Sequence, residues 1–423
     1  MKLIHVKNNS VLAVLFLSML GMAFVTTPAN SAGFSIARSA GMAGAHVGLA
    51  SGAAAPYYNP ANLGLATHRQ NGVLLAGVGL NISNNSFTLD DYNKYSGALL
   101  TDADKTDILA KVPVEGLIVS ADAEASASGI SYGRFAFNLT GFAASEANLG
   151  HDVLETLLYG NSFGDTISLT GMYGSGWSYG SVDFSYGTPL YTHGNRQLSV
   201  GATARYIKGL YFADVTKIDG AAATLTTGFS GNGEVIARTA EGGSGMAVDL
   251  GVALDINQYY TIGLNFKNFV SSINWNQNTE ERGYSFSFDS LNINNSGDSA
   301  VVSSDFRRPI DNFSSGLPST IRAGIAKTSG KLLWALDWEQ GFKRLPGASS
   351  TPQISLGAEY AALGFLPLRA GYSFGGRHGS QLAFGSGLRI PMFYIDAAVM
   401  TTGGVGSSSN KGAQFALSTG LHF

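Results

Sequence analysis

The sequence contains no cysteine, and only 13% of its 423 residues are charged. The lack of cysteine excludes disulfide scaffolding, thiol catalysis and zinc sites with cysteine ligands. The net charge of −3 gives no basic surface for binding nucleic acid. The seven histidines show none of the paired spacings typical of metal sites. We therefore expect no metal, no cofactor and no nucleic-acid partner.

Long apolar runs are also missing beyond the N-terminus. Glycine, serine, asparagine or a charged residue interrupts each run well before the roughly 18 residues that a membrane-spanning helix requires. The mean hydropathy is nevertheless +0.10, which excludes a disordered chain. The chain is rich in glycine, with 55 copies, and in the aromatic residues Phe and Tyr, with 24 and 18. This composition favours β-structure over helical structure.

Residues 1–31 have the organisation of a secretory signal peptide. Lys2 and Lys7 form a basic start, an apolar core spans residues 11–25, and a polar stretch leads to a small-residue cleavage site after Ser31 or Ala32. The alternative, a membrane anchor, fits poorly because the core is short and no stop-transfer sequence follows. We therefore expect the chain to be exported.

From about residue 72 to the end, apolar and polar residues alternate with the period of a β-strand. The clearest pair is 246–254 and 260–267, in which Val248, Leu250 and Val252 share one face while Asp249 and Gly251 share the other. The alternation predicts fourteen strands, at residues 72–83, 123–131, 134–143, 177–190, 196–210, 244–255, 258–270, 318–327, 331–340, 352–361, 366–374, 380–389, 392–401 and 411–423.

The connections between these strands alternate in length. Short turns are followed by mostly longer connections, at 84–122, 144–176, 211–243, 271–317, 341–351 and 402–410, and two of the longer ones contain predicted short helices near 89–110 and 151–159. A soluble β-sandwich has no reason to separate its loops by length, whereas a transmembrane barrel has short periplasmic turns, long external loops and an even number of strands. We therefore predict an all-β fold, a 14-stranded antiparallel transmembrane β-barrel over residues 71–423, with an N-terminal luminal hatch.

Further features place this barrel in the outer membrane of a Gram-negative bacterium, with both termini in the periplasm. The last ten residues alternate and end on Phe423, which resembles the signal that the barrel-assembly machinery recognises. Outer-membrane lipid and lipopolysaccharide are the expected surroundings.

The segment between the signal peptide and the first strand, residues 32–70, has a different character. Small residues dominate and the alternation is absent. Small side chains allow close approach to a barrel wall, and Gly and Pro allow tight reversals. The segment is predicted to be a hatch within the barrel, with its characteristic residues at Gly41, Gly44, Asn59, Pro60 and Ala61.

The chain resembles the FadL family of outer-membrane transporters for hydrophobic compounds, together with the related TraF-like barrels of plasmid transfer and PorV-like barrels of secretion. The resemblance depends on the start Ala32-Gly33-Phe34, the run 41–45, the motif Asn59-Pro60-Ala61 and Leu317-Pro318 at the eighth strand. It implies a hatch inside the barrel and a hydrophobic ligand that enters between the external loops.

The inward faces of the predicted strands carry charges of both signs. A strongly selective ion channel would show one sign in excess, so salt bridges between the wall and the hatch are expected rather than an ion path. The candidate residues are Asp183, Arg205, Asp249, Lys267, Arg322, Glu339, Glu359, Arg369 and Asp396, with Asp337 and Arg389 on the same faces.

Two functions remain open at this stage. The first is passive uptake of small hydrophobic molecules, fatty-acid-like or aromatic. The second is an assembly or attachment role in conjugal transfer or secretion, with a protein partner bound at the external loops 211–243 and 271–317, which are polar rather than apolar. We do not expect an enzyme: Gly176-Trp177-Ser178-Tyr179-Gly180 matches a nucleophile motif but leads into a strand and not into a helix.

Overall fold

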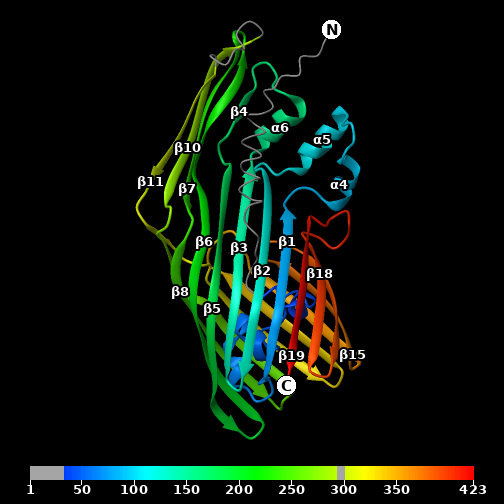
Figure 1. Ribbon diagram of the computed structural model, residues 1–423. Helices are drawn as coiled ribbons and strands as arrows, with labels where there is room; N and C mark the ends of the chain where they lie inside the picture. Colours follow the sequence, from blue (N-terminus) through cyan, green and yellow to red (C-terminus); the bar gives the residue numbers. More distant parts are fainter. Residues whose placement is uncertain (1–32, 293–300) are drawn as a thin grey trace.

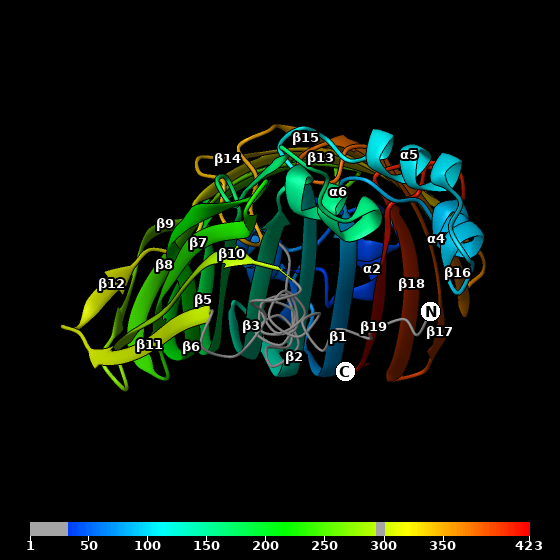
Figure 2. The same ribbon diagram turned by 90° about the horizontal axis from the view of Figure 1, so that it is seen from above.

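The computed structural model describes residues 33–292 and 301–423. The predicted signal peptide, residue 32 of the predicted hatch and residues 293–300 of the second long loop therefore lie outside the described residues. Within the described part, antiparallel strands form one continuous sheet that closes on itself, as Figures 1 and 2 show.

Fourteen strands make up the closed ring, as the sequence predicts. The first ring strand, β1, pairs with β2 on one side and with the last strand, β19, on the other, from Gly72 opposite His422 to Ser83 opposite Gly412. Ring closure leaves no sheet edge exposed along the barrel. In order around the barrel the strands are β1 (Gly72–Asn84), β2 (Leu117–Tyr132), β3 (Phe135–Leu149), β5 (Tyr173–His193), β6 (Arg196–Leu225), β8 (Gly243–Ile256), β9 (Tyr260–Trp275), β13 (Thr320–Ser329), β14 (Leu332–Gly341), β15 (Gln353–Leu363), β16 (Leu366–Gly375), β17 (Gln381–Ile390), β18 (Phe393–Thr402) and β19 (Gly412–His422).

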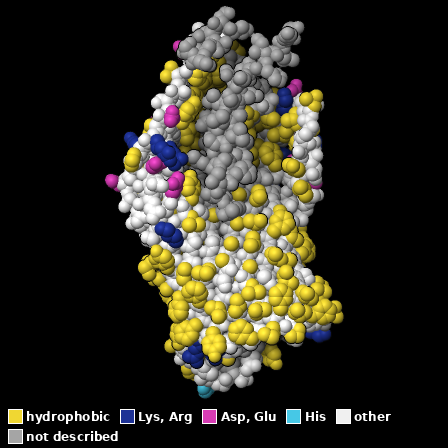
Figure 3. Space-filling view, in the orientation of Figure 1, with side chains coloured by type: hydrophobic (Ala, Val, Ile, Leu, Met, Phe, Trp, Pro, Cys, Tyr) yellow, Lys and Arg dark blue, Asp and Glu magenta, His cyan; other side chains and the backbone are white. Residues whose placement is uncertain are grey.

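The predicted faces of the strands are confirmed. In β8, Leu250 and Val252 are each 40% exposed, while Asp249 between them is 1% exposed. The same alternation gives the whole barrel an apolar outer surface, visible as the hydrophobic lower half of the molecule in Figure 3. An outward apolar band and a polar interior are the pattern of a barrel that lies in lipid.

The two ends of the ring differ. All the short turns between ring strands and the C-terminal residue Phe423 lie at one end, which we call the turn end. The predicted helices lie at the other end, which we call the extended end. They are α4 (Leu89–Tyr95), α5 (Asp102–Lys111) and α6 (His151–Tyr159). Thr88 and Thr101 begin α4 and α5 with complete capping boxes. No helix among the described residues has both the length and the apolar character needed to cross a membrane.

The prediction that residues 211–243 and 271–317 are loops was wrong, because most of their described residues belong to strands. β6 is 30 residues long and reaches Leu225. β7 (Gly228–Ala240) pairs with both β6 and β10 (Glu280–Leu291), and β10 in turn pairs with β11 (Val301–Pro309). These strands form a sheet, here called the extension, that projects from the ring (Figure 1). The added strands are β4 (Thr166–Ser168), β7 (Gly228–Ala240), β10 (Glu280–Leu291), β11 (Val301–Pro309) and β12 (Phe313–Ser315).

Candidate functional site

The chain N-terminal to β1, residues 33–71, lies inside the barrel, where Figure 2 shows its first helix, α2 (Ala37–Ala40), surrounded by the ring. We call it the N-terminal segment. It forms hydrogen bonds with β2, β3, β6, β8, β13, β14, β15 and β19, which lie all around the ring. Only a segment in the lumen can reach inward-facing groups on so many strands at once.

The N-terminal segment is a chain of very short helices. They are α2 (Ala37–Ala40), η1 (Gly52–Ala54), α3 (Ala55–Tyr58) and η2 (Pro60–Gly64). Proline occupies the first turn of α3 and of η2, where a missing N–H costs nothing. Between α2 and η1 the chain reverses at Ala43 and Gly44, whose φ angles are +52° and +87°. The positive φ at Gly44 is readily adopted only by glycine and explains its presence in the predicted hatch motif.

Asn59, Pro60 and Ala61 seat the N-terminal segment against one side of the wall. The Asn59 side chain accepts a hydrogen bond from the Ala61 N–H at 3.0 Å and donates one to the carbonyl of Val252 on β8 at 2.9 Å. The carbonyl of Ala61 accepts a bond of 2.6 Å from the Ser199 hydroxyl on β6. One asparagine thus both caps η2 and fixes it to the barrel.

Close approach to the wall requires glycine on both partners. A Cβ atom at Gly41 would lie 2.9 Å from the Cα of Gly385 on β17. A Cβ at Gly371 on β16 would lie 2.3 Å from the backbone carbon of Met42, closer than any real Cβ contact. Gly251, Gly263 and Gly357 of the wall are likewise in contact with the N-terminal segment. The wall glycines therefore accommodate this segment.

Glu359 on β15 is the centre of the largest charge cluster. Its carboxylate accepts hydrogen bonds from Arg38 of the N-terminal segment at 2.9 and 3.1 Å, from Arg369 at 2.7 Å and from Arg389 at 3.2 and 3.4 Å. Arg369 also binds Asp396 at 2.8 Å. Glu359, Arg369 and Asp396 are each at least 95% buried. Such a network is favourable in a dry interior only because each charge is paired.

A second contact joins β14 to the N-terminal segment. The carboxylate of Asp337 accepts the backbone N–H groups of His46 at 2.6 Å and Val47 at 2.8 Å. Beside it, Arg322 on β13 pairs with Glu339 at 2.7 Å and donates to the carbonyl of Tyr57. These strands thus hold both halves of the segment.

A third cluster is confined to the wall. Arg205 on β6 binds Asp249 on β8, its closest partner, and lies 3.4 Å from Asp183 on β5. Lys267 on β9 is also buried, but among the described residues it forms no ion pair or hydrogen bond. Its neighbours in a small cavity of about 30 Å³ include Phe142, Trp177 and Tyr179.

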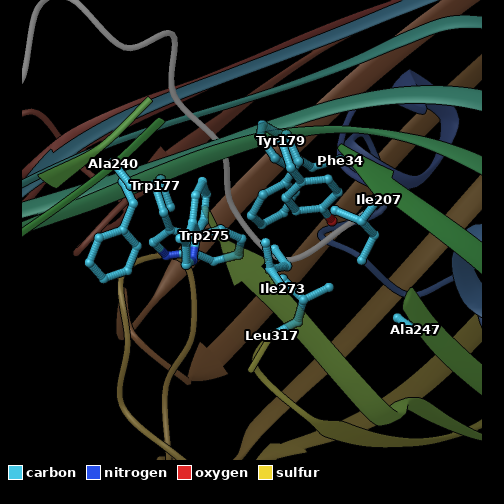
Figure 4. Close-up of a cluster of buried hydrophobic side chains, with 12 residues drawn as sticks. Phe34, Trp177, Tyr179, Ile207, Ala240, Ala247, Ile273, Trp275 and Leu317 are labelled. Carbon is cyan, nitrogen blue, oxygen red and sulfur yellow. The ribbon is translucent and has the colours of Figure 1, made fainter. Parts of the chain in front are cut away.

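These three aromatic residues belong to a larger apolar cluster on the inner wall (Figure 4). Phe142, Trp177 and Tyr179 have ring centroids 4.9 to 5.7 Å apart, and Phe34 of the N-terminal segment packs in the same cluster. The remaining members come from β3, β6, β7, β8, β9 and the residue before Pro318: Ala144, Ile207, Phe212, Ala240, Ala247, Ile273, Trp275 and Leu317.

The N-terminal segment separates two cavities. On its extended side, a cavity of about 100 Å³ is lined by Phe34, Ser39 and Val47. On its turn side, a cavity of about 300 Å³ is lined by Arg38 and His46. Neighbouring residues of this one segment therefore line two different cavities.

The structure brings most of the predicted site residues together and adds others. Gly41, Gly44, Asn59, Pro60 and Ala61 all lie in the N-terminal segment. Eight of the nine predicted wall charges are buried, and the ninth, Glu339, lines the lumen and pairs with Arg322. Phe423 follows β19, and its N–H donates to the carbonyl of Asn71 at 3.2 Å. The sequence reading missed Arg38 and also Glu124, which binds Gly33 and Ser35. Glu124 lies in the inward register of its strand, so the alternation of the sequence could have identified it as a residue that faces the lumen.

The pattern around Ser178 does not have the geometry of a nucleophile elbow. Ser178 lies in the middle of β5, so the glycine-serine-glycine pattern is part of a strand and not of a strand-to-helix turn. The described residues contain no group of three or more His, Asp or Glu that could hold a metal ion.

Comparisons with known proteins agree with this architecture. A family model described as a family of unknown function, DUF5723, matches residues 60–240. No curated protein matches the sequence. Among solved structures, the toluene transporter TodX of Pseudomonas putida is 14% identical with a TM-score of 0.52, and the match covers 94% of this chain and 99% of that one.

Two further structures give the same result. The toluene transporter TbuX of Ralstonia pickettii is 15% identical, with a TM-score of 0.52 and coverage of 93% of this chain and 99% of that one. A FadL homologue of Pseudomonas aeruginosa is 12% identical, with a TM-score of 0.51 and coverage of 94% and 99%. The fold of this chain is therefore the FadL-like 14-stranded barrel that the sequence resemblance implies.

Proposed function

We propose that the protein is an outer-membrane channel through which small hydrophobic molecules, aromatic ones among them, pass without energy coupling. The observation that carries this proposal is the buried aromatic cluster on the luminal wall, which contacts the N-terminal segment through Phe34. A hydrophobic compound leaves water when it binds to an apolar surface inside a barrel that also carries many polar inward residues.

The N-terminal segment acts in this proposal as a hatch. It lies between two cavities, and Arg38, His46 and Val47 bind it to the wall through Glu359 and Asp337. Release of these contacts lets a ligand move from the aromatic cluster toward the turn end. The toluene transporters with the same fold support an aromatic compound as the ligand.

The test is uptake of radiolabelled toluene by a Gram-negative host that expresses the protein. Trp177→Ala removes one of the three adjacent rings of the cluster and is expected to lower the uptake rate several-fold. Phe184→Ala is the matched control, since Phe184 lies on the same strand but faces outward and is 52% exposed. Heat-modifiable migration on gels verifies that each barrel is folded. Equal uptake by the two variants contradicts the proposal.

The extension supports a second candidate function, attachment of a protein partner. Its last strand, β11, pairs only with β10 among the described residues, so one edge is unpaired. An unpaired edge is a template for an added strand. Cysteine-specific crosslinking from Ser304→Cys on β11, with Thr192→Cys at the turn end as control, tests this role. A specific protein adduct from β11 alone supports attachment, and no adduct rejects it.

A further inference from the structure

The connection between β14 and β15, residues 342–352, folds into the barrel at its extended end. Leu345 and Ala348 form a tight turn, in which the Ala348 N–H donates to the Leu345 carbonyl at 2.8 Å. Pro346, Gly347 and Ala348, the tip of the connection, are buried. Connections normally run over the surface of a protein, so the burial of this tip requires a surface that receives it.

The tip lies against the aromatic cluster of the luminal wall. Gly347 and Ala348 line the small cavity of about 30 Å³ described above. Phe142, Trp177 and Tyr179 line the same cavity. Because the connection enters the lumen from the extended end, its tip covers the extended side of these rings.

A side chain of the connection reaches the far wall. Arg344, just before the tip, donates hydrogen bonds to the carboxylate of Glu146 on β3 at 3.1 Å and to the Tyr173 hydroxyl on β5 at 3.2 Å. That hydroxyl in turn donates to Glu146 at 2.6 Å. β3 is the third and β15 the tenth of the fourteen ring strands, so they lie on opposite sides of the barrel. The contact therefore spans the mouth of the extended end.

The two ends of this contact differ in how firmly they are held. Glu146 is 7% exposed, and its carboxylate also lies 3.4 Å from Arg377, which itself binds Asp122 on β2 at 3.0 and 3.2 Å. The side chain of Arg344, in contrast, is 60% exposed. Arg344 can thus leave for water at little cost, while its acceptor stays in place. This asymmetry is suited to a contact that opens and closes.

We propose that residues 342–352 are a lid on the extended mouth, and that Arg344 is the latch that holds the lid shut over the aromatic cluster. The inference concerns the regulation of the proposed channel and so rests on the proposed function. Release of Arg344 from Glu146 and Tyr173 frees the tip to leave the lumen, which uncovers the rings. Access from the extended end is then controlled separately from the N-terminal segment, which lies nearer the turn end (Figure 1).

Thiol labelling of a single introduced cysteine tests the lid. The chain has no cysteine of its own, so Ala348→Cys supplies one reporter at the buried tip. Its rate of reaction with a charged methanethiosulfonate reagent is measured on the purified full-length protein in mild detergent. We expect Arg344→Gln to raise this rate roughly three- to tenfold, which corresponds to the loss of one partly exposed charge-assisted hydrogen bond. Ser350→Cys, an exposed position of the same connection, should react equally fast with and without Arg344→Gln.

Two further variants identify the latch. Lys343→Gln is the matched control, since it removes a positive charge next to Arg344, and Lys343 forms no ion pair or hydrogen bond with any described residue. Tyr173→Phe keeps every charge and deletes only the hydroxyl that bonds both Glu146 and Arg344, so it is expected to raise the labelling rate by a smaller factor. Equal labelling of Ala348→Cys in the Arg344→Gln and Lys343→Gln backgrounds overturns the proposal.

The labelling needs no transported molecule, so it can fail or succeed independently of the proposed function. Toluene uptake is measured on the same backgrounds, and Arg344→Gln is expected to take up toluene faster than Lys343→Gln. Faster labelling in a protein that takes up no toluene supports the lid and rejects the channel. Toluene uptake with a labelling rate that Arg344→Gln does not change supports the channel and rejects the lid.

Discussion

Arg38 of the N-terminal segment donates two hydrogen bonds, of 2.9 and 3.1 Å, to the two carboxylate oxygens of Glu359 on β15. The pair is bidentate, and Arg38 and Glu359 lie 321 positions apart in the sequence. Bidentate arginine–carboxylate pairs are among the strongest polar contacts in proteins. This contact is therefore a principal attachment of the segment to the wall.

Glu359→Gln is expected to loosen the N-terminal segment. The change leaves three guanidinium groups close together without their shared anion, and loss of one partner from a buried pair costs roughly 3–5 kcal/mol. We expect a lower midpoint of urea unfolding and a rise in ion conductance in planar bilayers.

The control for this change is Glu234→Gln. Glu234 pairs with Lys217 on the extension, where the two side chains are 36% and 49% exposed. An exposed pair contributes about 0–1 kcal/mol, so neither the midpoint nor the conductance should change. If Glu359→Gln changes neither the ion conductance nor the midpoint of urea unfolding, Glu359 does not attach the segment to the wall.

Gly371→Ala is expected to displace the N-terminal segment by steric contact alone. The added methyl group would lie 2.3 Å from the backbone of Met42. Overpacking of this kind costs typically about 1–3 kcal/mol. The matched change is Gly364→Ala, where a Cβ meets nothing within 4 Å. We expect trypsin to cleave after Arg38 faster in Gly371→Ala than in Gly364→Ala. Equal rates of cleavage in the two variants contradict this prediction.

Deletion of residues 33–62 is expected to convert the barrel into an open, ion-conducting pore. The ring does not need the segment for its own pairing, because β1 is hydrogen-bonded to β2 and β19 throughout. Single-channel recordings in planar bilayers measure the change. A folded deletion variant that stays electrically silent would show that the segment does not close the lumen.

Low pH is expected to separate helices α4 and α5 at the extended end. Hydrogen bonds from the Tyr95 hydroxyl and from Lys111 lower the pKa of Asp107 from 3.8 to about 2. Since the folded-state pKa is depressed, the carboxylate stabilises the fold above pH 3.8, and this contribution disappears as the pH falls to about 2.

Pepsin digestion of the segment 89–111 measures this opening. Asp107→Asn removes the contribution at every pH, so the variant is expected to be cleaved faster than the wild type near pH 4. The ratio of the two rates cancels the pH dependence of pepsin itself. It should approach one as the pH approaches 2, and a ratio that stays constant contradicts the assignment.

The ring could be predicted from the sequence because each of its strands faces two different environments. In β8, lipid-facing Leu250 and lumen-facing Asp249 differ sharply in polarity, and this difference fixes both the strand and its register. The extension could not be predicted in the same way. Its last strand, β11, is exposed on both faces, so consecutive residues such as Ser303 and Ser304 show no alternation of polar and apolar side chains.

The location of the charges was predictable, but their partners were not. Inward register identifies Glu359 and Arg369, because neighbouring strands pair residue by residue. Arg38 lies in a segment without periodicity, and nothing in its local sequence indicates the strand that it meets. The same holds for Asp337, whose partners are backbone N–H groups of His46 and Val47. Contacts made by backbone atoms leave no trace in residue types.

The seam between β1 and β19 sets an order of events during biogenesis. It joins the first and the last strands of the barrel, so it cannot form until the final residues of the chain are available. The N-terminal segment directly precedes β1 and is tethered beside that seam. While the seam is open the segment can be laid against the curved sheet sideways, and closure then encloses it without any threading through a finished pore.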